Sequence, residues 1–222
     1  MKNLSDYRQA GRTDLSGRWA ESAMLSFVAC VAFSLVGGGG SILLSMWPFV
    51  SGLGNLFVLL LLPMSWGYNM AFLANHRRES NDPFDITCLV EGYHDFWRIF
   101  STYFLIVLYI FLWSLLLVIP GIIKSLSYSM TPYILKDRPD LSREAAIEMS
   151  MAMMSGRKMD LFLLQLSFIG WGILCIFTLG IGYFWLAPYM NSTYADFYED
   201  VKRDFENGGF SSPSPASDNY QR

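Results

Sequence analysis

One lysine, Lys124, lies inside the longest apolar region of the chain, four residues after Pro120. An ionisable side chain in an apolar segment is costly, and it therefore marks a candidate binding site for an ion or a substrate. Tyr128 lies four residues further on, so a helix would place both side chains on one face. An ammonium and a phenol together could bind an anionic lipid headgroup or a substrate carboxylate. Lys124 and Tyr128 are therefore a candidate anion or lipid contact.

A simpler interpretation of Lys124 needs no ligand. The aliphatic part of a lysine side chain can lie along apolar neighbours while its ammonium reaches the headgroup region. Lys124 would then be an interfacial anchor near a turn at Pro120-Gly121. Replacing Lys124 with alanine distinguishes the two interpretations, because only the first predicts the loss of an anion or lipid preference.

Other residue types that catalyse reactions or bind metals are few and scattered. The two histidines, His76 and His94, belong to one polar segment, and the sequence contains no HExxH motif. Cys30, Cys88 and Cys175 form no CxxC pair, so neither a zinc site nor a disulfide framework is predicted. No GxSxG motif marks a serine nucleophile. We therefore expect no metal, no cofactor and no catalytic residues, and hence a protein that is not an enzyme.

Polar residues near the apolar segments also limit the range of functions. Asp160 and Asp196 are the acidic residues closest to these segments, and both lie at segment ends. Coupled pumps generally need an ionisable group within a span, so this pattern argues against one. The amides of Asn69 and Gln165 lie within apolar segments, where interhelical hydrogen bonds of under about 2 kcal/mol each would accommodate them. We interpret Asn69 and Gln165 as intramembrane polar packing residues.

The elements that would position these residues are membrane-spanning helices. Of the 222 residues 53% are hydrophobic and only 16% are charged, whereas soluble domains carry about 25% charged residues. The apolar residues gather in stretches close to the roughly 20 residues that cross a bilayer as a helix. The chain is thus predicted to be all-α, a polytopic membrane helix bundle with about six transmembrane helices. The approximate spans are 21–46, 54–74, 100–119, 122–135, 159–177 and 181–197, within a membrane domain over 21–200.

Two details of this arrangement stay open. Spans 100–119 and 122–135 are short and meet at a turn at Pro120-Gly121, so the second could cross the membrane or be re-entrant. The glycine run from Gly37 to Gly40 in the first span indicates either close helix contact or a break in the helix.

Two polar segments between spans are predicted to form cytoplasmic amphipathic helices, 83–99 and 141–155. Asp82 and Pro83 suit the start of the first helix, and apolar residues follow at helical spacing. Ser142 or Asp140 could cap the second helix, whose several methionines make an adaptable surface. Either helix could lie on the membrane or receive a protein partner.

Basic residues are distributed unevenly around the predicted spans. All but one of the 16 Lys and Arg residues lie in four segments, which are 1–20, 76–98, 136–158 and the tail 201–222. With six spans these segments share one side of the membrane, and Lys124 stands alone on the other. The positive-inside rule places the basic side, with both termini, in the cytoplasm. The tail is rich in Gly, Ser and Pro and is predicted to be disordered.

Three stretches carry a resemblance to a known family. They are LVIPGIIKSLSYSMTPYIL, LSREAAIEMSMAMMSGRKMDLFLLQLSFIGWGIL and TLGIGYFWLAPYMNSTYADFYED, and the match is dense over about residues 117–200. LSGRW at 15–19 is similar to the short N-terminal motif of the same family. The sequence resembles the bacterial integral membrane proteins of domain of unknown function 975. The resemblance implies a multi-span protein of the bacterial inner membrane, and it implies no activity.

These patterns favour a non-enzymatic accessory, scaffold or lipid-interacting subunit of the bacterial inner membrane. Membrane lipids are the expected partners, together with a cytoplasmic or membrane protein bound through helices 83–99 and 141–155, and no nucleic acid is expected. The alternative is a transporter or channel for a small anionic or amphipathic solute, with Lys124 as the attracting charge. A lipid-acting membrane enzyme has the least support, because no nucleophile–base pair is identifiable.

Overall fold

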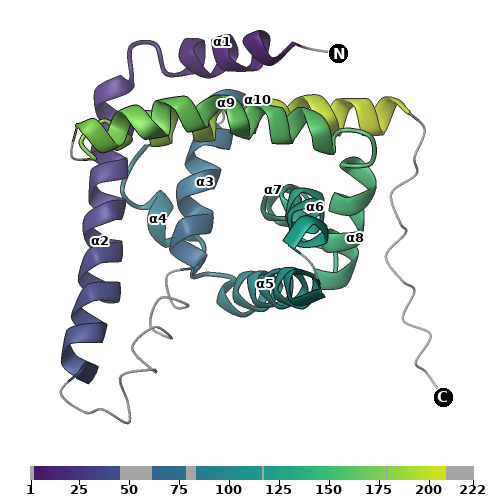
Figure 1. The fold of residues 1–222 in the computed structure, drawn as a ribbon, viewed down its shortest axis with the longest axis horizontal. Coiled ribbons are helices and arrows are strands. Elements are labelled where there is room, and N and C mark those ends of the chain that lie inside the picture. The colour runs from purple at the N-terminus through teal and green to yellow at the C-terminus, as the bar shows by residue number, and fades with distance from the viewer. Residues whose placement is uncertain (1–2, 46–61, 79–83, 117, 179, 209–222) are drawn as a thin grey trace. The chain divides into compact units, whose positions relative to one another are not determined.

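The computed structural model describes residues 3–45, 62–78, 84–116, 118–178 and 180–208 (Figure 1). These residues form helices joined by turns, with no strand among them, so the all-α prediction is confirmed. The helices are α1 (Leu4–Asp14), α2 (Trp19–Ser45), α3 (Leu62–Arg77), α4 (Cys88–Glu91), α5 (Phe96–Leu116), α6 (Val118–Tyr128), α7 (Thr131–Asp137), α8 (Arg143–Met153), α9 (Lys158–Phe177) and α10 (Tyr183–Asn207).

The chain folds as two compact units. The first comprises Met1–Phe100 and Leu166–Asp196, and the second comprises Ser101–Gln165 and Phe197–Arg222. The boundaries fall inside α5, α9 and α10, so each of these helices contributes residues to both units.

In the first unit, glycines allow α4 and the turn that follows it to pack closely against α3 (Figure 1). A Cβ atom at Gly67 would overlap the carbonyl oxygen of Cys88, and one at Gly92 would overlap the carbonyl oxygen of Pro63. Only glycine permits so close an approach of two backbones. Both contacts hold the segment after α3 against that helix.

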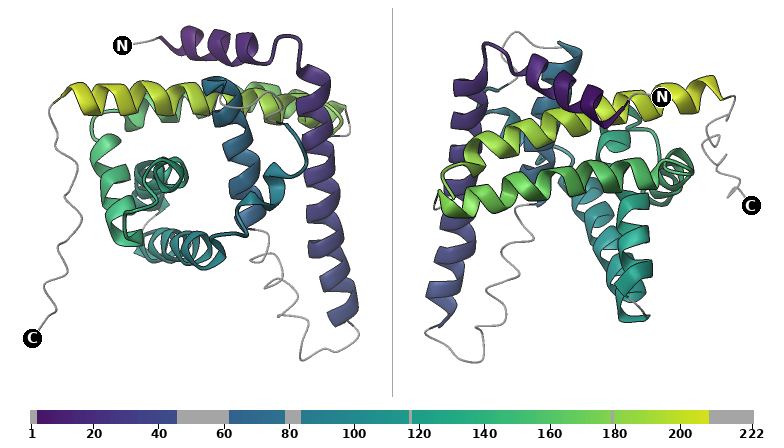
Figure 2. Two further views of the ribbon diagram at one scale, coloured as in Figure 1. Left: turned by 180° about the vertical axis from the view of Figure 1, so that it is seen from behind. Right: turned by 45° about the horizontal axis from the view of Figure 1, so that its top comes forward.

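The short polar helix α1 packs against α10, also within the first unit. Gly11 faces Thr193 so closely that a Cβ atom at Gly11 would overlap the threonine hydroxyl. The guanidinium carbon of Arg12 lies over the ring of Tyr189, 5.5 Å from its centroid. A polar helix therefore covers part of the segment predicted as span 181–197. The parts of α9 and α10 in this unit run alongside each other (Figure 2).

Helix α1 had a signal in the sequence, although residues 1–20 were predicted only as a polar segment. The backbone N–H of Asn3 donates to the carboxylate of Asp6 at 2.8 Å, as in one half of a capping box. Tyr7 and Leu15 are buried, so this polar segment also contributes to the core of the first unit.

In the second unit, α5 and α6 form an antiparallel hairpin with a consistent register. Trp113 lies opposite Lys124, and Tyr109 lies opposite Tyr128, with 6.2 Å between the ring centroids. From the first pair to the second, the α5 residue moves back by four positions and the α6 residue moves forward by four. These pairs alone establish that the chain reverses direction between the two helices.

The reversal does not occur at Pro120-Gly121, as the sequence predicted, but before it. Pro120 and Gly121 both lie in the first turn of α6, where proline is tolerated because the missing N–H would have no intrahelical acceptor. A Cβ atom at Gly121 would overlap the hydroxyl of Ser114 on α5. Gly121 therefore serves close helix contact in the hairpin.

The core of the second unit joins the hairpin to α8. Ile106, Tyr128 and Ile147 are buried together. The Ser150 hydroxyl on α8 donates to the backbone carbonyl of Ser127 at 2.8 Å. The buried face of α8 therefore packs inside this unit.

The structure also decides which residue caps α8. The Ser142 side chain accepts a hydrogen bond from the backbone N–H of Ala145 at 3.2 Å, so Ser142 is the N-cap. Asp140 instead pairs with Arg138, whose side chain donates to its carboxylate. That hydrogen bond holds the pKa of the Asp140 carboxyl below its ordinary value. The predicted helix 141–155 is observed as α8.

The number of helices able to cross a membrane is smaller than the six predicted. Among the described residues, two helical segments are long and apolar enough, Phe96–Leu115 and Lys158–Phe177. A third is added if the bent pair Leu4–Asp14 and Trp19–Leu35 counts as one span. The first two correspond to predicted spans 100–119 and 159–177.

Two of the remaining predicted spans do not form as single apolar helices, and the third is only partly described. Span 122–135 is divided between α6 and α7, which have only 11 and 7 residues. Span 181–197 is the beginning of a 25-residue helix whose second half is strongly charged. Span 54–74 lies partly outside the described residues, and α3, which covers its second part, has 16 residues. Apolar length in the sequence thus overestimated the length of apolar helix.

The predicted amphipathic helix 83–99 is also wrong as a continuous element. The described part holds the four-residue helix α4 and a turn, and α5 begins at Phe96. Gly92 interrupts the helical pattern, because its backbone is needed against Pro63. Asp82 and Pro83, the predicted helix start, lie outside the described residues.

Two further expectations are corrected. The break considered at Gly37–Gly40 does not occur, since α2 continues as a helix through these glycines to Ser45. The tail predicted to be disordered from residue 201 is helical up to Asn207, and residues 209–222 lie outside the described part.

Candidate functional site

The predicted contact of Lys124 and Tyr128 lies on the face of α6 that packs against α5. The ammonium of Lys124 lies 5.0 Å from the ring centroid of Trp113, a cation–π contact of about 0.5–2 kcal/mol. Tyr128 is buried in the core of the second unit. The two residues share a face but not an environment, because Lys124 is only half-buried and Tyr128 is a core residue.

The two predicted polar packing residues, Asn69 and Gln165, also differ in how far they are buried. Asn69 is half-buried on α3, and Gln165 is exposed on α9. Two helix-to-helix hydrogen bonds in the first unit involve other α3 residues. The hydroxyls of Tyr68 and Ser26 on α2 are 2.8 Å apart, and Asn75 donates to the backbone carbonyl of Asp14 at 3.0 Å.

A cluster of charged residues in the first unit joins the ends of α1 and α3 to α10. The imidazole of His76 lies between two carboxylates. Its Nδ1 is 2.6 Å from Asp14 Oδ2, and its Nε2 is 3.6 Å from Asp196 Oδ1. Asp196 is almost fully buried, with 4% of its side chain exposed. Sequence reasoning placed Asp14 and His76 in polar segments and Asp196 at the end of an apolar segment, and it did not bring the three together.

The geometry of this cluster is that of a structural tie. The Ser192 hydroxyl donates to Asp14 at 3.4 Å, so the carboxylate stands between the serine and the imidazole. A catalytic serine instead needs the imidazole between hydroxyl and carboxylate, so that the imidazole can accept its proton. Arg18 reinforces the tie by donating to the side-chain oxygen of Asn75 at 3.2 Å.

The second unit has its own buried charge cluster around Arg157, at the start of α9. Its Nη2 donates to Asp200 Oδ2 at 2.7 Å, and its Nη1 lies 3.0 Å from Asp204 Oδ2. The Arg157 guanidinium also lies 5.9 Å from the ring centroid of Phe197. Arg157 is 6% exposed. Buried charges are tolerated only when paired, so these contacts fix the second half of α10 to α9.

A second link in the same unit runs between α7 and α10. Lys202 Nζ lies 2.6 Å from Asp137 Oδ2, and the Tyr198 hydroxyl donates to the same oxygen at 2.8 Å. The rings of Tyr133 and Tyr198 are stacked, with centroids 4.9 Å apart. Tyr198, Asp200 and Lys202 on α10 therefore make structural contacts, which explains why the helix continues into the predicted tail.

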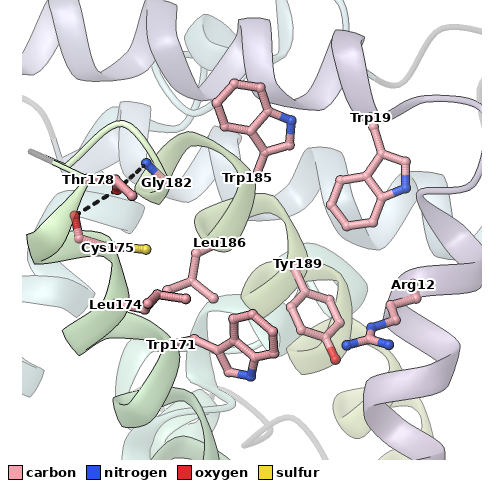
Figure 3. Close-up of a pocket in the computed structure, with 10 residues that line it drawn as sticks. All are labelled: Arg12, Trp19, Trp171, Leu174, Cys175, Thr178, Gly182, Trp185, Leu186 and Tyr189. Atoms are coloured by element: carbon pink, nitrogen blue, oxygen red, sulfur yellow. Dashed lines mark hydrogen bonds between the residues drawn. The ribbon is translucent and has the colours of Figure 1, made fainter.

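The first unit also contains a pocket of about 290 Å³ between α1, the start of α2 and the turn that joins α9 to α10 (Figure 3). Its walls are mainly aromatic and aliphatic, and Arg12 is its one charged lining residue. The ten lining residues are Arg12, Trp19, Trp171, Leu174, Cys175, Thr178, Gly182, Trp185, Leu186 and Tyr189.

The turn at one end of this pocket is held by Thr178. Its hydroxyl donates to the backbone carbonyl of Cys175 at 2.9 Å and accepts from the backbone N–H of Gly182 at 3.1 Å. Gly180 has a φ of +84°, a conformation that favours glycine. The turn is therefore well specified by its sequence.

This pocket conflicts with the six-span arrangement. It brings Arg12 close to the turn between α9 and α10. Six straight spans would instead place Arg12 and this turn on opposite faces of the membrane. A hydrocarbon core of roughly 30 Å separates those faces. A pocket of only about 290 Å³ cannot have lining residues on both of them. Sequence reasoning missed the pocket because its aromatic residues come from segments far apart in the chain.

Among the described residues, no group of three or more His, Cys, Asp or Glu side chains is placed to hold a metal ion.

Part of the chain matches a known protein family. Residues 114–204 match the family described as protein of unknown function (DUF975). The resemblance to domain of unknown function 975 is thus confirmed over this segment, which extends from the end of α5 into α10 and includes Lys124 and Arg157. Neither the comparison with curated proteins nor that with solved structures found a match.

Proposed function

We propose that the protein is a non-enzymatic, lipid-interacting accessory or scaffold protein of the bacterial cytoplasmic membrane. The observation that carries the proposal is the exposed apolar surface of α5 and α9. On α9 the exposed fraction reaches 81% at Phe177. The exposed large apolar residues of these two helices include Phe104, Val107, Phe111, Leu115, Leu166, Ile169, Ile173, Ile176 and Phe177.

Such a surface is costly in water. Transfer of apolar area out of water is favourable by roughly 25 cal/mol per Å², and large exposed apolar patches mark membrane or protein contacts. The apolar segments of α5 and α9 are 20 residues long each, and so long an apolar surface favours lipid as the covering medium, whether the helix crosses the bilayer or lies in its interface. The charged residues Asp196, Arg157 and Asp200, in contrast, are buried within their own units.

The placement of α1 supports a specific orientation. If Arg12 and the turn at 178–182 lie on the same membrane face, the α9–α10 hairpin does not cross the bilayer completely and lies along that face instead. The four basic segments then still share one side. The positive-inside rule therefore continues to favour a cytoplasmic location for both termini.

Of the two segments expected to receive a protein partner, the structure favours the one around α4. The buried face of α8, with Ala146, Ile147, Ser150 and Met153, already packs inside the second unit. Ile86, Val90 and Trp97, in contrast, are exposed. A membrane surface or a partner protein could cover these three side chains.

Membrane association is tested by extracting cell membranes with alkaline carbonate and then with detergent. We expect the protein to stay with the membrane in carbonate and to dissolve only in detergent, because its apolar helices need a lipid or micelle environment. Release by carbonate alone would contradict the proposal.

Orientation is tested by cysteine labelling in a background without Cys30, Cys88 and Cys175. Single cysteines at the exposed positions Thr13 and Ile181 are treated with a membrane-impermeant maleimide, in intact spheroplasts and in inverted vesicles. We expect both positions to react from the cytoplasmic side. If the two positions react from opposite sides, α9 and α10 each cross the membrane completely and the proposed orientation is refuted.

A further inference from the structure

We propose that the pocket lined by Arg12 and Tyr189 in the first unit binds the phosphate headgroup of an anionic lipid. This inference deepens the proposed function and rests on it for the origin of the ligand. The pocket lies outside the pair Lys124 and Tyr128, which belongs to the other unit.

The charge of the pocket favours an anion. Among the described residues, no carboxylate lies within ion-pair distance of Arg12, and its one described contact is the face of the Tyr189 ring. The guanidinium therefore keeps its hydrogen-bond donors for a ligand. Arginine offers five N–H donors in a planar arrangement suited to phosphate oxygens.

Tyr189 supplies a second polar group on the same side of the pocket (Figure 3). Tyr189 is 6% exposed, and its hydroxyl oxygen has no hydrogen-bond partner among the described residues. A buried polar group without a partner costs about 1–3 kcal/mol. The exposed side chain of Arg12 can move off the ring, and a phosphate oxygen could then accept hydrogen bonds from both residues.

The rest of the pocket suits an amphiphile better than a free anion. Trp19, Trp171 and Trp185 line the pocket (Figure 3), and tryptophan, like tyrosine, is enriched at the headgroup level of membranes. Leu174 and Leu186 add aliphatic surface. The volume of about 290 Å³ is at the lower end of the roughly 300–1,000 Å³ of small-molecule sites, which fits a headgroup and the first part of its chains.

The chain contains a native probe of this pocket. Cys175 lines it and is half-buried, whereas Cys30 lies exposed on α2 outside it. In detergent micelles, the alkylation rates of both thiols by N-ethylmaleimide are measured by peptide mass spectrometry. The additions are phosphatidylglycerol, phosphatidylcholine or inorganic phosphate at equal concentration.

We expect phosphatidylglycerol to slow alkylation of Cys175 about fivefold or more and to leave Cys30 unchanged. Phosphatidylcholine and inorganic phosphate should protect neither thiol. Equal protection by phosphatidylcholine would show that any lipid covers the thiol, and protection by inorganic phosphate would show a free-anion site. Either result would overturn the proposal.

Variants assign the effect to the two polar residues. Arg12→Gln should raise the phosphatidylglycerol concentration for half-protection about tenfold or more, because a charge-assisted hydrogen bond is lost. Arg8→Gln, one turn away on α1, should leave it unchanged. Tyr189→Phe keeps the ring and should raise the half-protection concentration about threefold or more. Tyr183→Phe should leave this concentration unchanged.

Unchanged protection in Arg12→Gln, or an equal loss in Arg8→Gln, would refute the assignment. If Arg12→Gln unfolds, the Tyr189→Phe result decides alone. Because protection is measured in micelles, it is independent of the carbonate extraction. If carbonate releases the protein but phosphatidylglycerol still protects Cys175, the proposed function is refuted and the pocket proposal stands. If the protein stays with the membrane but Cys175 is not protected, the pocket proposal is refuted and the proposed function stands.

Discussion

The buried cluster around Arg157 predicts a large and specific effect of a single substitution. Arg157→Ala removes the guanidinium and leaves the carboxylate of Asp200, whose side chain is only 10% exposed, without its closest cation at 2.7 Å. Removing one member of a buried ion pair costs about 3–5 kcal/mol, because the remaining charge stays away from water.

A third carboxylate, that of Asp160, lies 3.4 Å from Arg157 Nε, and the three carboxylates do not contribute equally. The side chains of Asp160 and Asp204 are 43% and 55% exposed, and exposed pairs contribute about 0–1 kcal/mol each. The free energy of unfolding should therefore fall by about 3 kcal/mol, most of it from Asp200. In a chain of this size 1 kcal/mol shifts Tm by about 2–4 °C, so Tm should fall by about 6–12 °C.

The assay is thermal unfolding of the purified protein in detergent, followed by intrinsic fluorescence. Arg143→Ala is the matched control, because Arg143 is exposed and lies 4.0 Å from Glu144, and it should change Tm by less than about 2 °C. In a double-mutant cycle, Arg157→Ala with Asp200→Asn should show a coupling of about 1–3 kcal/mol. A fall in Tm no larger than that of Arg143→Ala, or zero coupling, would refute the reasoning.

Three further substitutions test other parts of the structure. His76→Ala should lower the free energy of unfolding by about 1–3 kcal/mol, because Asp14 and the buried Asp196 lose the imidazole between them. The exposed His94→Ala is its control, and equal Tm values for the two variants would contradict the tie. Gly121→Leu should cost about 1–3 kcal/mol by overpacking against α5. Gly172→Leu should not, because a Cβ atom added at Gly172 would meet nothing within 4 Å, and urea unfolding measures the difference. Lys124→Ala should fold and retain less anionic lipid in native mass spectrometry, and unchanged retention would leave Lys124 as an interfacial anchor.

The sequence predicted the helical class and the two most apolar helices correctly because both follow from local composition. The start of α8 was also accessible, since Ser142 is a strong N-cap residue. The turn before α6 was placed a few residues too late because proline and glycine have two roles. They end helices, but proline also fits a first helical turn, and glycine also permits close helix contact.

The pocket and the two charge clusters could not be predicted from local patterns. Asp14, His76 and Asp196 are separated by more than 60 and more than 100 residues, and nothing in their own segments indicates that they meet. The boundary between the two compact units likewise falls inside continuous helices, where no linker composition marks it. Lys124 attracted attention because it is isolated in the sequence, whereas Arg12 is one of several basic residues in a polar segment.

The second half of α10 shows why the end of this helix was predicted too early. Counting apolar residues ended the sixth span at 197 and assigned the residues beyond 200 to a tail. Tyr198, Asp200 and Lys202 instead make the contacts that hold α10 to α7 and to the start of α9. Helix α10 is fixed in this way at its charged end, and Arg12 of the polar helix α1 lies over Tyr189 in its first half. In the orientation proposed above, this helix lies at the membrane surface, which is also where an arginine and three tryptophans would meet a lipid phosphate.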